Sequence, residues 1–235
     1  MGNLLEISGL TKNYQALRPL RIARLTVGAG QILSIGGIDA PAAETLVHLI
    51  TGAMLPDEGR VMLFGHNTRE ITDGAAWLKS LDGLGMVTAR GILVEAFSVL
   101  QNVAMSYTLE VDPIDPAIAP RATELAVSIG IEAALLDVPA GTVRPDVKMR
   151  VHLARSLALE PKLLIAEHPS ASLPRDSVAA FGADLARAAQ SRGLALLVIT
   201  GDDTLVRATG GQRLELNATT GELKPPGFLK KIFRS

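Results

Sequence analysis

The sequence predicts an α/β fold with a mostly parallel sheet at its core, joined by an antiparallel β subdomain and a helical subdomain. Two purely apolar runs, residues 163–166 and 194–199, are typical of strands buried on both faces. These runs alternate with segments of helical periodicity, and that order is typical of a parallel sheet covered by helices. The first third of the chain instead alternates apolar and polar residues, which favours half-buried antiparallel strands.

Composition limits the classes of protein to consider. The chain has 235 residues, enough for one large domain or two small ones, and 48% of them are hydrophobic, so we expect a sizeable core. With 23 basic and 24 acidic residues the charges nearly cancel, so we expect no nucleic-acid partner. The lack of cysteine excludes disulfides and thiolate metal sites. No apolar run is long enough for a membrane span and no signal peptide is visible, so we expect a cytoplasmic protein.

The first third of the chain reads as short strands separated by turns. The expected elements are a strand at 4–7, a turn at Ser8 and Gly9, a second short segment at 10–14, a strand at 22–27 and, after a turn at 56–59, a strand at 60–64.

A strand–loop–helix unit at residues 30–52 organises this part of the chain. The apolar run 32–35 predicts one buried strand, and Gly36 and Gly37 allow a tight turn after it. Residues 38–44 are expected to form a loop, with a helix from Thr45 onward. A loop between a strand and a helix N-terminus is the geometry that binds phosphates.

The phosphate-binding pattern G-x-x-x-x-G-K-[ST] can be aligned with this loop. Gly37 fits the first glycine, but Ala42 stands at the second and Ala43 stands at the lysine. Glu44 replaces the hydroxyl residue that would hold Mg²⁺, and only Thr45 remains beyond it. The strand and the helix are kept, whereas the groups that would bind phosphate are absent.

Glu44 and Thr45 each have a structural interpretation. We expect Glu44, in or next to the first helical turn, to supply from within the protein the negative charge that a bound phosphate would give the helix dipole. Thr45 is either an ordinary first-turn residue or a nucleotide contact.

The rest of the chain is expected to form a helical insertion followed by further strands and helices. The expected elements are a strand at 83–87, a helix at 97–109, a proline-broken loop at 113–120, a helix at 121–130, a helix beginning at 143–146, a strand at 163–166 that ends at Glu167, a helix at 177–191 and strands at 194–199 and 212–216. Lys148, Arg150 and Arg155 are expected on a solvated helix face, and Asp202 and Asp203 in a turn.

Three segments together resemble one known family, the ATP-binding subunits of ABC transporters. They are LLEISGLTKNY at 4–14, LITGAMLPDEGRVMLFG at 49–65 and, as the strongest match, VHLARSLALEPKLLIAEHPSASL at 151–173. The short loops and the FSVLQNVAM segment look most like the subfamily that serves lipoprotein exporters.

The resemblance implies a P-loop NTPase ABC cassette over the whole chain, as a single ATP-binding domain. The implied parts are a core and β subdomain at 1–88 and 151–217, a helical subdomain at 89–150 and a basic amphipathic tail at 222–235. It also implies ATP and Mg²⁺ as ligands, ATP hydrolysis coupled to transport, a membrane permease as partner and a second ATP-binding subunit. Bound nucleotide would then lie against Tyr14 and the Gly37–Thr45 region, with Glu167 as the metal ligand.

The chain departs from the family at the positions that perform the chemistry. Ala89 stands at the Mg²⁺-sensing glutamine, residues 143–147 replace the LSGGQ signature, Glu167 stands at the metal-strand aspartate, His168 at the catalytic glutamate, Pro174 at the acid after that strand and Gly201 at the switch histidine. These departures predict that nucleotide binding is weak or absent and that no catalytic residue remains.

Structural alternatives stand beside each residue that could still act. Tyr14 either stacks on adenine or packs on the β subdomain. Glu167 is either a metal ligand or a hydrogen-bonded carboxylate. His168 is a general base by residue type, or a packing residue at a strand end.

The sequence therefore leaves several functions open. The first is a degenerate ATP-binding subunit, without ATP hydrolysis, in a membrane-associated transport complex. The second is a structural or regulatory module that keeps the cassette shape. The third is a weakly active ATPase that uses Glu167 and His168.

The expected contact with a membrane partner lies in residues 89–97. Ile92, Leu93, Val94 and Phe97 would leave apolar surface exposed unless a partner covers them or they fold into the core. In the tail, apolar residues at 228, 229, 232 and 233 share a helical face beside basic residues, so the protein could also lie peripherally on the inner face of the cell membrane.

Overall fold

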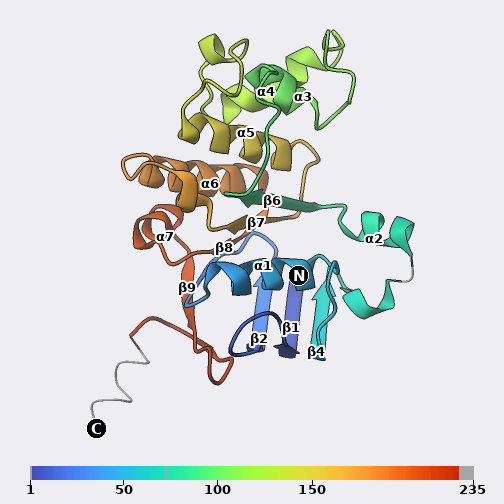
Figure 1. Cartoon of the computed structure of the whole chain (residues 1–235), viewed down its shortest axis with the longest axis vertical. Coiled ribbons are helices and arrows are strands. Elements are labelled where there is room, and N and C mark those ends of the chain that lie inside the picture. The colour runs from blue at the N-terminus through green and yellow to red at the C-terminus, as the bar shows by residue number, and fades with distance from the viewer. Residues whose placement is uncertain (1, 72, 228–235) are drawn as a thin grey trace.

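The computed structural model describes residues 2–71 and 73–227 (Figure 1). The strands are β1 (Asn3–Lys12), β2 (Leu20–Gly28), β3 (Ile32–Gly36), β4 (Glu58–Leu63), β5 (His66–Asn67), β6 (Leu84–Thr88), β7 (Leu163–Glu167), β8 (Ala195–Ile199), β9 (Gln212–Leu216) and β10 (Leu223–Lys224). The α-helices are α1 (Ala40–Ile50), α2 (Gly74–Ser80), α3 (Val99–Ala104), α4 (Ala119–Ser128), α5 (Pro145–Leu157), α6 (Val178–Arg192) and α7 (Asp203–Thr209).

The elements form layers around a mostly parallel sheet. Its six strands follow the order β10-β9-β3-β8-β7-β6, and all neighbours pair in parallel except β10 with β9. Helices α5 and α6 cover one face, with α3 and α4 beyond them, and α1 covers the other face (Figure 1). Beyond α1 lies the four-stranded antiparallel sheet, in the order β2-β1-β4-β5. The predicted α/β fold class is thus observed.

Alternate residues of the parallel strands feed two separate cores, because successive side chains of a strand point to opposite faces. In β7, Leu164 and Ala166 join the cluster under α3–α6, whereas Leu163 and Ile165 join the cluster that holds α1 and the antiparallel sheet. This explains why these strands are apolar throughout: β7 and β8 are buried at every position.

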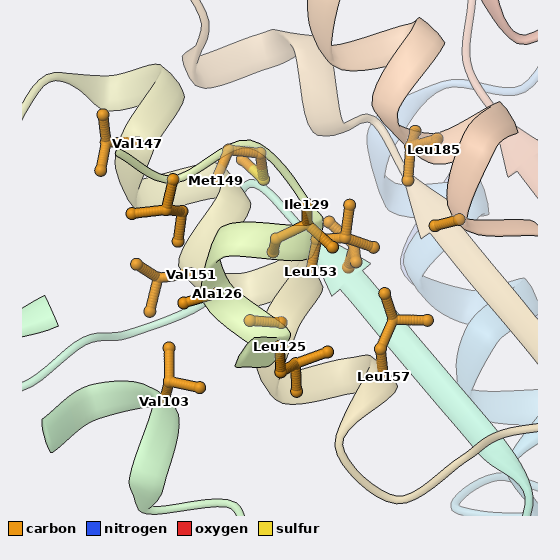
Figure 2. Close-up of a cluster of buried hydrophobic side chains, with 14 of the residues drawn as sticks. Val103, Leu125, Ala126, Ile129, Val147, Met149, Val151, Leu153, Leu157 and Leu185 are labelled. Carbon is orange, nitrogen blue, oxygen red and sulfur yellow. The ribbon is translucent and has the colours of Figure 1, made fainter. Parts of the chain in front are cut away.

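The helical layer shares its core with the parallel sheet. Figure 2 shows Leu125 and Ala126 of α4, and Ile129 directly after it, close to side chains of α5, among them Leu153 and Leu157, and all of them belong to one buried cluster. Helix α5 runs through residue 150, where the sequence placed the end of the helical subdomain. The domain limits remain a prediction.

The N-terminal strand differs from the prediction. Ser8 and Gly9 do not turn the chain, because both lie inside the continuous strand β1. Gly9 has φ +58°, and the pairing of β1 with β4 is irregular between Ser8 and Thr11. The glycine therefore produces a bulge within the strand instead of ending it.

Several helices also differ from the prediction in their extent. The helix expected at 97–109 is only α3, which begins after a capping box formed by Ser98 and Gln101. Helices α2 and α7 were not predicted. Asp202, expected in a turn, is the N-cap of α7, where its side chain accepts hydrogen bonds from the backbone of Thr204 and Leu205.

The predicted amphipathic part of the tail, residues 228–235, lies outside the described residues. Over the part of the chain that is described, no helix is long and apolar enough to cross a membrane.

The shared helical core predicts a large cost for truncating Leu153, which is fully buried in α5. Leu153→Ala should lower the free energy of unfolding by about 2–5 kcal/mol, through lost burial and the cavity left behind. Val127→Ala on α4 is the matched control, because Val127 is 47% exposed and its truncation should cost little. Urea titration of both variants checks this, and equal losses would contradict the packing described.

Candidate functional site: the first turn of α1 and the carboxyl edge of the sheet

Helix α1 begins at Ala40, so the loop expected at 38–44 is mostly helical. Asp39 is the N-cap, and its carboxylate accepts a hydrogen bond of 2.9 Å from the backbone N–H of Ala42. Pro41 lies in the first turn, where its fixed φ favours helix and its missing N–H costs nothing. An ordinary capped helix start therefore replaces an open loop of free backbone N–H groups.

Glu44 does not supply the negative charge that balances the helix dipole of α1, so that expectation was wrong. The first turn of α1 contains no acidic residue, and the carboxylate at the helix N-terminus belongs to Asp39. Glu44 lies further along the helix, and its half-exposed carboxylate pairs with Arg90. The charge that balances the helix dipole thus comes from Asp39.

Thr45 and Ala43 are both turned into the protein. Thr45 is not a first-turn residue; it is 5% exposed, and its hydroxyl donates a hydrogen bond of 2.8 Å to the carbonyl of Pro41. Ala43, at the position of the lysine in the phosphate-binding pattern, is fully buried in the core cluster around α1. Both side chains are therefore buried within the protein.

Gly37 and Gly36 are required by the close approach of β9. A Cβ on Gly36 would lie 2.5 Å from the carboxylate oxygens of Glu215, and a Cβ on Gly37 would lie 2.6 Å from the carbonyl oxygen of Leu216. Gly37 also has φ +73°, in the left-handed region that favours glycine. These contacts explain the glycine pair without a ligand.

Arg90 joins two carboxylates at the edge of the sheet. Its Nη2 lies 2.8 and 2.6 Å from the two carboxylate oxygens of Glu167, and its Nη1 pairs with Glu44. The register explains the contact, since Thr88, two residues before Arg90, is the partner of Glu167 in the β6–β7 pair. Glu167 is only 7% exposed, so Arg90 neutralises a carboxylate that is nearly removed from water.

Electrostatics keep this guanidinium charged. Burial works against the charge of Arg90, but the hydrogen bond and charge of Glu167, together with the charge of Glu44, outweigh it and raise the pKa of Arg90. Glu167, expected as a Mg²⁺ ligand, thus has both oxygens bonded to a cation of the protein itself. Among the described residues no group of three or more His, Asp or Glu side chains is placed to hold a metal ion.

His168 and Gly201 follow the carboxyl ends of β7 and β8. His168 has φ +41°, its backbone N–H donates to the carbonyl of Ile199 at 2.9 Å, and its Nε2 is buried without a hydrogen-bond partner. Gly201 is exposed, and nothing lies within 4 Å of where its Cβ would be. Their roles at the catalytic and switch positions remain predictions.

Tyr14 lines a cavity of about 450 Å³ that reaches the start of α1. The lining includes Tyr14, Leu17, Arg18, Pro19, Ile38 and Asp39. Tyr14 also packs against the core cluster around α1, and burial followed by the charge of Asp39 raises its pKa. The structure thus places Tyr14 and Gly37 around one cavity, while a nucleotide in it remains a prediction.

The segment in place of the LSGGQ signature forms the charged first turn of α5. Asp146 bonds to Arg144 at 2.9 Å and to Arg150 at 3.0 Å, and Arg150 also bonds to Asp184 at 2.8 Å. The expectation that Arg150 lies on a solvated face is therefore wrong, since its side chain is 14% exposed and bridges α5 to α6. This turn presents ion-paired side chains instead of bare backbone.

Comparison with known proteins gives the family. No protein-family model matches the chain. The lipoprotein-releasing system ATP-binding protein LolD 2 of Caulobacter vibrioides is 32% identical over 209 residues, which cover 87% of this chain and 90% of that protein. LolD of Geobacter metallireducens is 29% identical, over 89% of this chain and 94% of that protein. The chain belongs to the family of ATP-binding subunits of ABC transporters.

Solved cassettes share the fold of this cassette. The cbiO1 protein from Clostridium perfringens, described as part of the ABC transporter complex cbiONQ, has a TM-score of 0.79 at 22% identity, covering 99% of this chain and 91% of that one. The dimeric cassette MJ0796 bound to ADP and Pi has a TM-score of 0.76 at 21% identity, covering 94% and 96%. The predicted P-loop NTPase cassette fold is confirmed, as is the resemblance to the lipoprotein-exporter subfamily.

The residues around the phosphate position of this cassette do not fit Mg·ATP. Arg90 lies between Glu44 and Glu167 and supplies the positive charge that a bound Mg²⁺ would bring. The carboxylate of Asp39 caps the N-terminus of α1, the helix end at which a phosphate would bind. Sequence reasoning missed both residues. The Asp-x-Pro order at 39–41 is a helix-start signal that was visible, whereas the contacts of Arg90 depend on the order of the strands.

A groove of about 450 Å³ lies beside the segment where a partner was expected. Its lining includes Met86, Gly91, Ile92, Met105, His152, Arg155 and Leu159. Burial and the charge of Arg155 lower the pKa of His152 to about 4, so its imidazole is neutral near pH 7. Of the apolar residues expected on this surface, Ile92 is 84% exposed, but Leu93 is buried and Phe97 packs against the core.

The cap at α1 predicts that two substitutions of Asp39 differ in their effect on stability. Asp39→Ala should lower the free energy of unfolding by about 0.5–2 kcal/mol, because the backbone N–H of Ala42 loses its acceptor. Asp39→Asn should retain most of the stability, since an asparagine side chain can accept the same hydrogen bond. Denaturant titration measures both. An unchanged stability of Asp39→Ala would show that the carboxylate does not hold the helix start.

Proposed function

We propose that this chain is a cassette subunit of a membrane-associated transport complex that keeps the cassette shape without hydrolysing ATP. The observation that carries the proposal is the pairing of Arg90 with Glu44 and Glu167. That pairing supports a site whose charge balance is complete without Mg²⁺ or nucleotide.

Magnitudes favour weak nucleotide binding. A bound Mg²⁺ would have to displace Arg90 from Glu167, and a terminal phosphate would approach Glu44 without the lysine that Ala43 replaces. Losing one charge-assisted contact costs about 1.5–3 kcal/mol, and about 1.4 kcal/mol is tenfold in affinity. Repulsion between Glu44 and a phosphate would add to that loss.

The partner we propose is an ABC permease or another membrane subunit, which would place the chain in the cytoplasm on the inner face of the cell membrane. The relatives named as lipoprotein-releasing ATP-binding proteins support a transport complex of that type. The groove that includes Ile92, Met86 and Leu159 supports a docking place for it, because exposed apolar rims typically mark an interface.

Pairing with a second ATP-binding subunit is part of this proposal, since one similar cassette is dimeric. The phosphate-loop region and the segment that replaces the signature both carry ion-paired side chains here. An active partner would therefore meet altered groups on both sides of the shared interface. This favours a subunit that shapes the complex over one that supplies half of its chemistry.

Two other functions compete with this proposal. We call the start of α1 with the Arg90, Glu44 and Glu167 pairing the closed site. A structural or regulatory module would keep this closed site but bind no permease. A weakly active ATPase would use the buried and unpartnered Nε2 of His168 as a base beside Glu167, and that atom is the observation in its favour. The bonding of both Glu167 oxygens to Arg90 counts against it.

Calorimetric titration tests the absence of a nucleotide site. With Mg·ATP, with ATP in excess EDTA and with Mg²⁺ alone, we expect a dissociation constant weaker than about 1 mM, and no phosphate release over hours. A micromolar affinity that depends on Mg²⁺ would refute the closed site. Phosphate release that disappears in His168→Ala would favour the weak ATPase instead.

Docking is tested at the groove with charged substitutions on exposed side chains. Ile92→Asp and Leu159→Asp should abolish co-purification of the chain with membranes of its source cells, because each places a carboxylate in an apolar contact. Leu109→Asp is the matched control, since Leu109 is 85% exposed, close to the 84% of Ile92, and is outside the residues that line the groove, so it should not change co-purification.

Equal co-purification of all these variants would move the docking place away from the groove. If neither the unmodified chain nor any variant associates with membranes, the regulatory module becomes the better account.

A further inference from the structure

Residues 89–98 connect β6 to α3 and carry Ile92 on the rim of the groove. Side chains from other elements hold this connection at separate points. Nη1 of Arg155 on α5 donates to the carbonyl of Ile92 at 3.0 Å. The fully buried Asn102 on α3 accepts from the N–H of Val94 at 2.9 Å and donates to the carbonyl of Val94 at 3.0 Å.

Arg90 supplies a further attachment of this connection, which reaches α1 and β7. It is the residue of this connection whose side chain bonds to α1, through Glu44, and to β7, through Glu167. Its partner Glu167 is almost buried, so leaving that carboxylate unpaired would be costly. An arginine is charged at every physiological pH, so the attachment needs no ligand.

The backbone around Arg90 forms short hydrogen-bonded turns that begin at Thr88. The N–H of Gly91 donates to the carbonyl of Thr88 at 3.1 Å, and the N–H of Arg90 donates to the hydroxyl of Thr88 at 3.3 Å. Gly91 is packed under the imidazole of His152, whose nearest ring atom would lie 2.6 Å from a Cβ at that position. The backbone between Arg90 and Ile92 is thus fitted closely to α5.

We propose that Arg90 is a positioning residue that tethers residues 89–94 to α1 and β7, so that the groove is formed whether or not nucleotide is present. Docking of the membrane partner would then be permanent and would not follow a nucleotide cycle. The inference about docking rests on the proposed function. The tether itself rests only on the contacts of Arg90.

Hydrogen–deuterium exchange measured by mass spectrometry on the whole chain tests the tether. In the unmodified protein, the amides of Arg90, Gly91 and Val94, which donate to Thr88 and Asn102, should exchange slowly and at the same rate with and without Mg·ATP. Arg90→Gln should accelerate them by at least about tenfold, because the tether is lost while Asn102 and Arg155 remain. Arg90→Lys should restore part of the protection, because it keeps the charge but not the paired contact with Glu167.

Matched variants separate the tether from general loosening. Arg121→Gln removes another arginine, paired at 3.6 Å with Glu160, and should leave residues 90–94 unchanged. Glu44→Gln removes only the half-exposed partner of Arg90 and should accelerate exchange less than Arg90→Gln does. If Arg90→Gln fails to fold, Glu44→Gln still tests the tether.

The outcomes distinguish the tether from the proposed function. Fast exchange of the Arg90, Gly91 and Val94 amides in the unmodified chain, or no acceleration in Arg90→Gln and in Glu44→Gln, would overturn the tether even if no nucleotide binds. Slowing of these amides on adding Mg·ATP would also overturn it. Micromolar nucleotide binding with unchanged exchange at 90–94 would defeat the proposed function and leave the tether standing.

Discussion

Parallel pairing of β3, β8, β7 and β6 determines which residues can meet at the site. The carboxyl ends of these strands lie at one edge of the sheet, as expected for strands that run in the same direction. Strand β3 leads from that edge into α1, β7 ends there at Glu167, and β6 ends there at Thr88, the register partner of Glu167. Two residues beyond Thr88, Arg90 therefore lies beside Glu167 and can reach Glu44 on the first helix.

In this arrangement the charged groups at the edge of the sheet are balanced by contacts within the protein. Two carboxylates and a helix N-terminus meet at the same edge, and each has a protein group as its counterpart. Arg90 neutralises the carboxylates, and Asp39 accepts from the first turn of α1. The second charged network, Asp146 with Arg150 and Asp184, similarly fixes the start of α5 against α6. Ion pairs within the protein thus neutralise the carboxylates that these two regions bury.

Local sequence patterns predicted most of the fold because strands and helices here follow apolar periodicity closely. The runs at 163–166 and 194–199 lie within or overlap β7 and β8, and the alternating stretch at 22–27 lies within β2. The errors occur where one or two residues determine whether a strand continues or where a helix begins. Gly9 makes a bulge and not a turn, and Asp39 with Pro41 starts α1 earlier than the aligned motif suggested. In the second case the N-cap and the proline fix the start of the helix, whatever phosphate-binding pattern is aligned with them.

The site was only partly predictable, for a different reason. The absence of the lysine at Ala43 and the substitutions at Glu44 and Ala89 can be seen in the sequence alone. The pairing of Arg90 with residues 46 positions before it and 77 positions after it cannot, because it depends on strand order and register. Burial of Ala43 and the direction of the Thr45 hydroxyl likewise follow from where α1 packs.

The most direct test of the closed site is a crystal structure of the chain grown with Mg²⁺ and a non-hydrolysable ATP analogue at millimolar concentration. We expect that Arg90 bridges Glu44 and Glu167 in that structure, that Asp39 caps α1, and that no phosphate lies at the start of that helix. Density for a triphosphate there, with Mg²⁺ bound to Glu167 and the side chain of Arg90 displaced, would contradict this expectation.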